Sequence, residues 1–158
     1  RPDRIVLGEL RGGEALDILQ AMVSGHGGCM GTLHATYPRD TLTRLETMAL
    51  MSDVEMPLAA LRLQIASGIN LIVQVSRERD GARRVTHISE VSAFDVESGR
   101  YEIRDLFLRR YDGLDSEGRL RSTLLPTGSL PSFLPQLHAR GIDLPSAMHD
   151  AARTEGPP

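Results

Sequence analysis

The first 35 residues alternate between apolar runs and glycine-rich breaks, and this order narrows the possible folds more than any other feature. Residues 5–10 form a short run rich in branched side chains, which is typical of a strand covered on both faces. A Gly-Gly pair breaks that run, and residues 14–24 carry apolar side chains at helical spacing. Residues 25–28 contain glycines of the kind that end helices, and Cys29–His34 predicts a second strand. A strand, a helix and a strand in this order indicate an α/β fold with a parallel sheet.

Two more helices are expected before the pattern changes at Gly68. One begins near Pro38 and runs to about Met51, and the next begins at Pro57, because proline favours the first turn of a helix. Three strands follow, over residues 69–75, 85–94 and 100–107. Asp-Gly and Ser-Gly dipeptides lie between them, and such pairs favour tight turns. We predict a meander of three antiparallel strands on the edge of the parallel sheet.

The chain is expected to divide into three parts. Residues 1–110 form the main domain, since most of the predicted helices and strands fall there. Residues 111–145 form an extension with a polar loop over 112–129 and a short helix over 131–140. Residues 146–158 are expected to be a disordered tail, because chain ends are often poorly ordered. A chain that begins with arginine and enters a strand at once is also expected to be a fragment of a longer protein.

Composition excludes several classes of function. All 18 basic residues are arginine, so this sequence contains no phosphate-binding loop of the Gly-Lys-Ser/Thr type. The net charge is −3 and the arginines are scattered, which argues against nucleic acid as the main partner. The single cysteine, Cys29, excludes an intrachain disulfide framework and a multi-cysteine zinc site, and it is compatible with a reducing cytoplasm. No apolar run approaches the ~20 residues needed to span a bilayer.

Glu9 is the first residue with a candidate chemical role. It lies at the end of the first predicted strand, and ligands of open α/β sheets bind beyond the carboxyl ends of the strands. A carboxylate there is able to orient an attacking water or to hold the water shell of Mg²⁺ during phosphoryl transfer. The alternative is a solvated carboxylate at a strand end that pairs only with Arg11.

His34 ends the second predicted strand and is the second candidate. Because side chains alternate along a strand, Thr32 and His34 are expected on one face and Cys29 on the other. A ring N–H at this edge is placed to contact a terminal phosphate; the alternative is a hydrogen bond to a neighbouring backbone carbonyl. His26, Cys29 and His34 also suggest a zinc site. We expect none, since Cys29 and His34 face opposite ways and no fourth close ligand is evident.

Several segments, taken in order, resemble the type II/type IV secretion ATPases. Residues 1–15, Arg-Pro-Asp-Arg-Ile-Val-Leu-Gly-Glu-Leu-Arg-Gly-Gly-Glu-Ala, resemble the Walker B segment of that family. Residues 24–28, Ser-Gly-His-Gly-Gly, and residues 31–35, Gly-Thr-Leu-His-Ala, resemble its His box. Further matches are Pro-Arg-Asp at 38–40, Arg-Leu-Glu-Thr-Met at 44–48 and Gln-Ile-Ala-Ser at 64–67. The resemblance covers about residues 1–110 and weakens through 111–145.

Two details are similar to one branch of the family, the tight-adherence (Flp) pilus assembly ATPases, often called CpaF-like. They are the Gly-Gly pair after Arg11 and the Arg-Leu-Glu-Thr-Met run. Two other positions depart from the family pattern. Asn70 stands where many members carry an acid, and Tyr37 precedes Pro38 where a small capping residue is common.

The resemblance implies the carboxyl-terminal half of a RecA-like P-loop NTPase domain, with parallel core strands and an antiparallel edge meander. It implies a homo-hexameric ring of cytoplasmic ATPases at the inner face of the bacterial cytoplasmic membrane, where inner-membrane platform proteins of a pilus or secretion machine are the partners. Glu9 would be the Walker B glutamate, which activates water and supports Mg²⁺, and His34 would be the phosphate sensor. Arg11 and Thr32 would support the nucleotide. Mg²⁺ and ATP are the implied cofactors of the complete protein, without zinc.

The missing P-loop leaves other functions open. Without its lysine the chain alone is expected to be inactive, so it is either half of a motor or a non-enzymatic module that docks against ring neighbours or the membrane platform. A RecA-like nucleic-acid motor is a third possibility, which the absence of a basic stripe disfavours. The strands near Ile5 and Leu33 would expose an edge and an apolar face if they stood alone.

Overall fold

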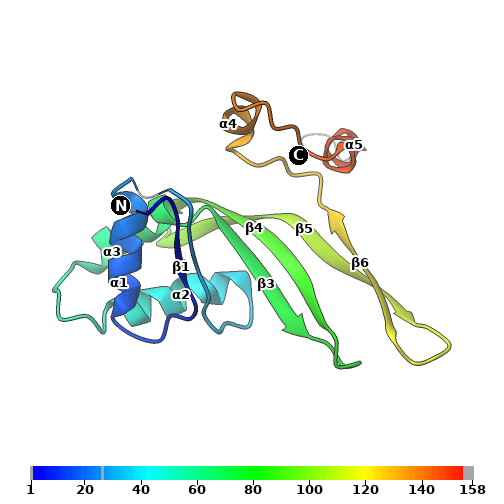
Figure 1. The fold of residues 1–158 in the computed structure, drawn as a ribbon, viewed down its shortest axis with the longest axis horizontal. Coiled ribbons are helices and arrows are strands. Elements are labelled where there is room, and N and C mark those ends of the chain that lie inside the picture. Colours follow the sequence, from blue (N-terminus) through cyan, green and yellow to red (C-terminus); the bar gives the residue numbers. More distant parts are fainter. Residues whose placement is uncertain (1, 26, 155–158) are drawn as a thin grey trace. The chain divides into compact units, whose positions relative to one another are not determined.

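The computed structural model describes residues 2–25 and 27–154 (Figure 1). Its elements are β1 (Ile5–Leu7), α1 (Glu14–Val23), β2 (Cys29–Gly31), α2 (Pro38–Ala49), α3 (Leu58–Gly68), β3 (Leu71–Arg77), β4 (Arg83–Asp95), β5 (Arg100–Leu114), β6 (Leu120–Pro126), α4 (Leu134–His138) and α5 (Ser146–Thr154). The chain gathers into two compact units. Unit 1 contains Arg1–Asn70 and Val91–Ile103, and unit 2 contains Leu71–Glu90 and Arg104–Pro158.

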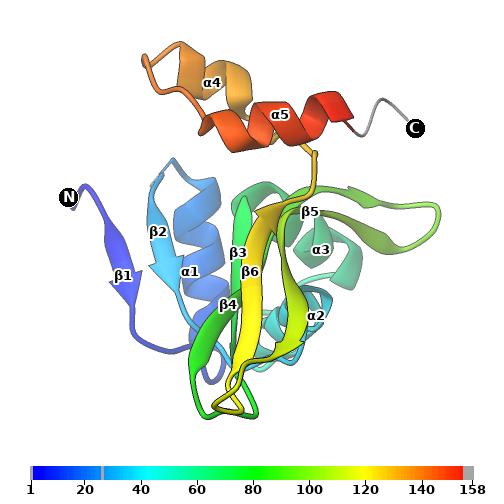
Figure 2. The same cartoon turned by 90° about the vertical axis from the view of Figure 1, so that its right-hand side faces the viewer.

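In unit 1, β1 and β2 pair in parallel, as the order of strand, helix and strand predicts (Figure 2). Val6 lies opposite Met30, and Leu7 lies opposite Gly31. The intervening α1 contacts β2. Because the strands are parallel, their carboxyl ends lie at the same edge of the pair, and the residues that follow each strand come together there.

The strands of this pair are shorter and more exposed than expected. β1 covers three residues of the apolar run, and β2 ends at Gly31, before His34. Val6 is 67% exposed and Met30 is 58% exposed, so the prediction of a strand covered on both faces is wrong. No element in the described part of unit 1 covers these two neighbouring side chains. The expected exposure of an apolar face is therefore confirmed.

Three helices make the core of unit 1. α1 contacts α2 and α3, and α2 contacts α3. Each helix turns an apolar stripe inward, which is how an amphipathic helix is stabilised in a protein. The buried side chains are Ala15, Leu16, Ile18 and Leu19 of α1, Leu42, Leu45, Met48 and Ala49 of α2, and Leu61 and Ile65 of α3. Burying one leucine or isoleucine contributes roughly 1.5–3 kcal/mol, so this cluster fixes α2 beside α1.

The second sheet is built on antiparallel pairing and is larger than predicted; its residues 91–103 belong to unit 1, and the rest of it belongs to unit 2. The strands lie in the order β3-β4-β5-β6 and form a hydrogen-bonded sheet separate from the β1-β2 pair. Three of the four strands are the expected meander, which is thus confirmed as antiparallel. The meander is not hydrogen-bonded to the β1-β2 pair, so the prediction that it lies on the edge of the parallel sheet is corrected.

The fourth strand replaces a predicted loop. β5 continues to Leu114, and β6 returns beside it between Leu120 and Pro126. The Asp115 carboxylate accepts the backbone N–H groups of Glu117 and Arg119 at 2.9 and 2.8 Å, which closes the turn between the strands. The prediction of a polar loop over 112–129 is wrong, because polar side chains on an exposed strand resemble loop residues in sequence.

Two short helices end the described chain. α4 falls inside the expected helix of residues 131–140. The predicted disordered tail is corrected, because residues 146–154 form α5, which contacts β6 (Figure 2). Met148 anchors it and is only 4% exposed. Residues 155–158 lie outside the described chain. Within residues 2–25 and 27–154, no helix is both long and apolar enough to cross a membrane.

Candidate functional site

Glu9 meets Arg11 and His34 just beyond the carboxyl ends of β1 and β2. Its Oε2 accepts hydrogen bonds from Arg11 Nε at 2.8 Å and Arg11 Nη2 at 2.5 Å. Its Oε1 lies 3.1 Å from His34 Nε2. The Glu9 side chain is 28% exposed, whereas the arginine and histidine side chains are 78% and 87% exposed. The two residues chosen from sequence as catalytic candidates, 25 positions apart, thus lie in direct contact.

Thr32 holds together the two segments that carry this cluster. Its carbonyl accepts the Leu10 N–H at 2.7 Å, and its hydroxyl donates to the Gly8 carbonyl. These bonds continue the contact between the segments after the regular strands have ended. His34 therefore lies three residues beyond β2, and the prediction that it ends the strand is corrected. Thr32 was predicted to support a nucleotide; in this structure its hydroxyl supports the backbone.

Glu14 is a functional candidate that the sequence reasoning missed. Its Oε1 accepts the backbone N–H of Arg11 at 2.7 Å and that of Gly12 at 3.1 Å. These bonds hold the pKa of Glu14 below its usual value, since they favour the charged carboxylate. A glutamate three residues after the start of a turn is the spacing by which acids bind free N–H groups ahead of a helix. That spacing in Arg-Gly-Gly-Glu was the available signal.

The cluster keeps Glu9 ionised. The hydrogen bond from Arg11 lowers the pKa of Glu9, and this outweighs the opposing effect of burial; the charges of Arg11 and His34 act in the same direction as the hydrogen bond. A carboxylate has about four acceptor positions. Oε2 has two donors and Oε1 has one neighbour, so Oε1 retains room to accept a hydrogen bond from a water molecule.

The residues present fit only part of a magnesium–ATP site, the part that would hold a water or a metal-bound water. Glu9 is suited to hold a water or a metal-bound water, as a carboxylate at this edge of an α/β sheet often is. The described residues include no group of three His, Cys, Asp or Glu side chains able to hold a metal ion. The sequence also has no lysine for a phosphate-binding loop. The chain therefore offers a carboxylate that is able to hold a water, without a lysine for a phosphate-binding loop.

The zinc set considered from sequence gains no support. Cys29 is half-buried in β2, while the His34 side chain is mostly exposed and faces Glu9. His26 lies outside the described residues.

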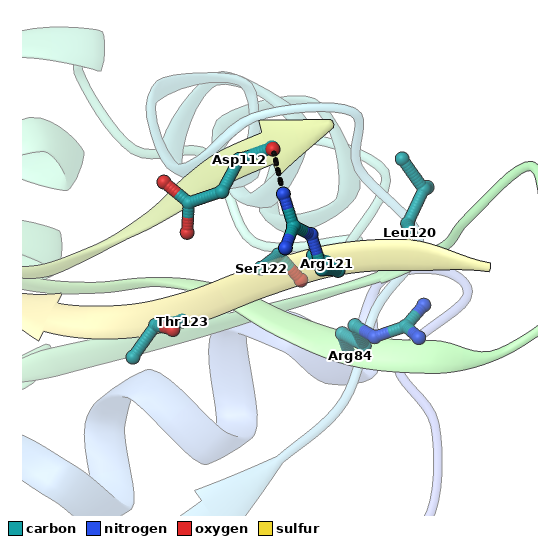
Figure 3. Close-up of a pocket in the computed structure, with 6 residues that line it drawn as sticks. All are labelled: Arg84, Asp112, Leu120, Arg121, Ser122 and Thr123. Atoms are coloured by element: carbon teal, nitrogen blue, oxygen red, sulfur yellow. Dashed lines mark hydrogen bonds between the residues drawn. The ribbon is translucent and has the colours of Figure 1, made fainter. Parts of the chain in front are cut away.

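A pocket of about 500 Å³ adjoins the cluster, between Arg11 and His34 on one side and α2 on the other. A second hollow, of about 600 Å³, lies on the strands of unit 2 (Figure 3). In the second, Arg84 is already bound to the Asp80 carboxylate at 2.8 and 2.7 Å. Arg121 donates to the Asp112 carbonyl at 3.3 Å, as the dashed line in Figure 3 marks. Its two arginines are thus occupied, which leaves the pocket beside α2 as the stronger candidate.

Comparison with known proteins places this chain in a family. Residues 1–107 match the family described as type II/IV secretion system protein. The chain belongs to this family. Its matched region contains Glu9, Arg11, Thr32 and His34, so the whole cluster lies within the family domain.

Several known proteins are similar to this chain in sequence. A conjugal transfer protein of Mycobacterium tuberculosis is 40% identical over 89 residues, which are 56% of this chain and 25% of that protein. The type IV secretion system protein PtlH of Bordetella pertussis is 44% identical over 86 residues, which are 52% of this chain and 25% of PtlH. The chain thus spans about a quarter of the length of these relatives.

A solved structure shares the fold of the matched part of this chain. The crystal structure of the VirB11 ATPase from the Brucella suis type IV secretion system, in complex with sulphate, matches with a TM-score of 0.53 and 34% sequence identity. The match covers 56% of this chain and 27% of the VirB11 chain. It confirms the expected fold class, an α/β chain that corresponds to part of a P-loop NTPase domain.

Proposed function

We propose that this chain is the carboxyl-terminal half of a hexameric ATPase that couples ATP hydrolysis to assembly of a Flp/Tad-type pilus or to type II-like protein secretion. Membership of the type II/IV secretion family supports the general role, as do relatives named for type IV secretion and conjugal transfer. The Gly-Gly pair after Arg11 and the Arg-Leu-Glu-Thr-Met run at 44–48 favour the CpaF-like branch.

The contact of Glu9 with both Arg11 and His34 is the observation that carries this proposal. Glu9, ionised at neutral pH, orients the attacking water through the acceptor position left on Oε1. Arg11 holds the carboxylate by two hydrogen bonds, so that Oε1 faces His34. The His34 ring lies within reach of any phosphate that binds beside Glu9, as a phosphate sensor requires.

The chain supplies only part of the proposed site. When bound, Mg²⁺ and ATP supply the metal charge and the phosphoanhydride bond. Thr32 keeps the two segments of the site together, and Glu14 fixes the backbone from which Arg11 extends. The lysine and hydroxyl of a P-loop must come from sequence outside these 158 residues, so the isolated chain is proposed to be inactive.

The proposed partners follow from the same role. Other copies of the protein complete a homo-hexameric ring, and inner-membrane platform proteins of a pilus or secretion machine receive its motion. The proposed location is the cytoplasm, peripheral to the inner face of the cytoplasmic membrane. The scattered arginines and the net charge of −3 make nucleic acid an unfavoured partner.

ATP turnover with Mg²⁺ tests the proposal. We expect no turnover by the 158-residue chain and turnover by a protein extended upstream through a P-loop. In the extended protein, Glu9→Gln should lower turnover by roughly 100-fold or more, because the carboxylate that orients the water is lost. Glu55→Gln is the matched control, since Glu55 is exposed and lies outside the cluster. Intact turnover in Glu9→Gln would show that Glu9 does not have this role.

A second function, a non-enzymatic docking module, is favoured by two observations. The chain has no lysine, and Val6 and Met30 present an apolar surface in unit 1. In this case the extended protein would lack turnover, while Val6→Ser combined with Met30→Ser would weaken its association with ring neighbours. Turnover in the extended protein would exclude this alternative.

A further inference from the structure

The pocket beside α2 is lined by one stripe of that helix. The α2 side and the residues just after it contribute Asp40, Thr43, Arg44, Thr47, Met48 and Met51. Steps of three and four residues bring side chains to the same face of a helix, so this lining is a continuous stripe. The opposite wall carries Arg11, His34 and Thr36. All of these residues belong to unit 1.

The polar groups of this stripe differ in how many partners they already have. The Asp40 Oδ2 accepts the Tyr37 N–H at 3.1 Å, so this carboxylate caps the start of α2. The Thr47 hydroxyl donates to the Thr43 carbonyl at 3.1 Å, within the helix. Arg11 uses Nε and Nη2 to bind Glu9. The Asp40 carboxylate and the Arg11 guanidinium therefore already have hydrogen-bond partners.

Arg44 is the group that remains available. Its side chain makes no ion pair or hydrogen bond with any residue in the described ranges, and it is exposed and lines the pocket. The Thr43 hydroxyl next to it donates no hydrogen bond to another described residue. A free guanidinium beside a free hydroxyl group is a donor set that binds a phosphate group, because arginine matches the geometry of its oxygens.

We propose that this pocket binds a phosphate group through Arg44 and Thr43, next to the Glu9 cluster. The pocket opens against His34 and Arg11, and its lining therefore reaches from the proposed site of hydrolysis to α2. The proposal that the pocket binds the phosphate of ATP, before or after cleavage, rests on the proposed ATPase function. The proposal that the pocket binds a phosphate ion does not rest on that function.

A titration with inorganic phosphate tests the site itself. Binding is followed by ³¹P NMR on the 158-residue chain and on the same chain with Arg44→Ala, Thr43→Val or Arg39→Ala. We expect roughly tenfold weaker binding in Arg44→Ala, a smaller loss in Thr43→Val, and no change in Arg39→Ala. Arg39 is the matched control, because it is an exposed arginine of α2 that does not line the pocket. Equal affinity in Arg44→Ala and Arg39→Ala would overturn the proposal.

The extended protein separates the two sources of the phosphate. Competition between inorganic phosphate and a non-hydrolysable ATP analogue would identify the terminal phosphate of the nucleotide, whereas simultaneous binding would identify the released ion. If the extended protein has no turnover, the ATPase proposal fails while the titration still decides the pocket. If turnover is present and Arg44→Ala leaves phosphate affinity unchanged, the pocket proposal fails alone.

Discussion

The side chains of Glu46 in α2 and Arg62 in α3 form an ion pair in unit 1 that is joined by two hydrogen bonds. Arg62 Nε lies 3.0 Å from Glu46 Oε1, and Nη2 lies 3.2 Å from Oε2. The Tyr101 hydroxyl donates to the same Oε1 at 2.8 Å, and the Arg62 guanidinium lies 5.6 Å from the centre of the Phe94 ring. Glu46 is only 8% exposed, so its charge is compensated almost wholly by these partners. The network fixes the helix whose other residues line the phosphate pocket.

Tyr101→Phe tests how much this network contributes. Burial raises the pKa of Tyr101, and its bond to Glu46 acts in the same direction, so the phenol remains a donor at all ordinary pH values. Removing the hydroxyl leaves a buried carboxylate with one donor fewer. We expect a loss of about 1.5–3 kcal/mol in the free energy of unfolding, measured by urea denaturation. Tyr37→Phe is the control; Tyr37 is 61% exposed, and we expect it to change stability by less than about 0.5 kcal/mol. Equal effects in both variants would contradict this.

Sequence patterns predicted the first half of the fold because the residues that mark the ends of its helices are adjacent to those helices in the sequence. Prolines and glycines bound α1, α2 and α3, and their apolar stripes are regular. The predictions failed where the formation of a strand or a helix depends on contacts with other elements. β6 reads as a loop because one of its faces is polar, and α5 reads as a tail because Met148 is the only deeply buried side chain among those described for this helix.

The contact between two of the candidate residues could be expected from the sequence, and their catalytic roles stay predictions. Glu9 and His34 were found because acids and histidines after parallel strands meet at one edge of the sheet. Glu14 was missed although its spacing in Arg-Gly-Gly-Glu was an available signal, and Arg44 was missed because no spacing rule places it beside the segment that carries Arg11. Glu14 reaches back to two backbone N–H groups, and Arg44 faces a pocket made with residues from the other segment.

Arg11→Ala should raise the pKa of Glu9. The hydrogen bond from Arg11 is the main cause of the lowered pKa, and its removal leaves burial to act in the opposite direction. The Glu9 carboxyl ¹³C signal, followed by NMR through an acid titration, should shift its midpoint upward towards the value of an ordinary glutamate. Arg39→Ala is the control of equal charge, because Arg39 is exposed and is not among the residues that contact Glu9. A midpoint that does not move in Arg11→Ala would mean that the pairing is absent in solution.

Gly13→Ala should destabilise unit 1, although Gly13 has an ordinary negative φ. A Cβ at this position would lie 2.9 Å from Ser52 Cα and 3.2 Å from the Met51 carbonyl oxygen, both in the backbone. Since backbone atoms cannot move aside cheaply, we expect a loss of about 1–3 kcal/mol. Gly12→Ala is the neighbouring control, because its Cβ would meet only the end of the Glu14 side chain at 3.2 Å. Thermal unfolding measures both, and equal losses would contradict the close approach of Gly13 to Ser52.

Glu90 of β4 joins two parts of unit 2 through its buried carboxylate. It is 1% exposed, and its Oε1 accepts the Ser132 N–H at 2.8 Å and the Ser132 hydroxyl at 2.5 Å. Its Oε2 lies 2.7 Å from Arg104 Nη2. Burial by itself raises the pKa of Glu90, but the bonds from Ser132 and Arg104 lower it more, and the pKa lies below that of an ordinary glutamate.

This lowered pKa predicts a stability difference that depends on pH. A carboxyl whose pKa is lower in the folded state stabilises the fold above its unfolded value of about 4.3, and the contribution is lost as the pH falls through the folded pKa. Glu90→Gln should therefore cost about 1–3 kcal/mol at pH 7, and the difference from the natural chain should shrink as the solution becomes more acidic than the folded pKa. Urea denaturation across this pH range measures it. Glu97→Gln is the control, since Glu97 is exposed and its difference should stay near zero throughout. A Glu90→Gln difference that is the same at acidic and neutral pH would mean that the uncharged shape of Glu90, and not its ionised bonds, holds Ser132 and Arg104 in place.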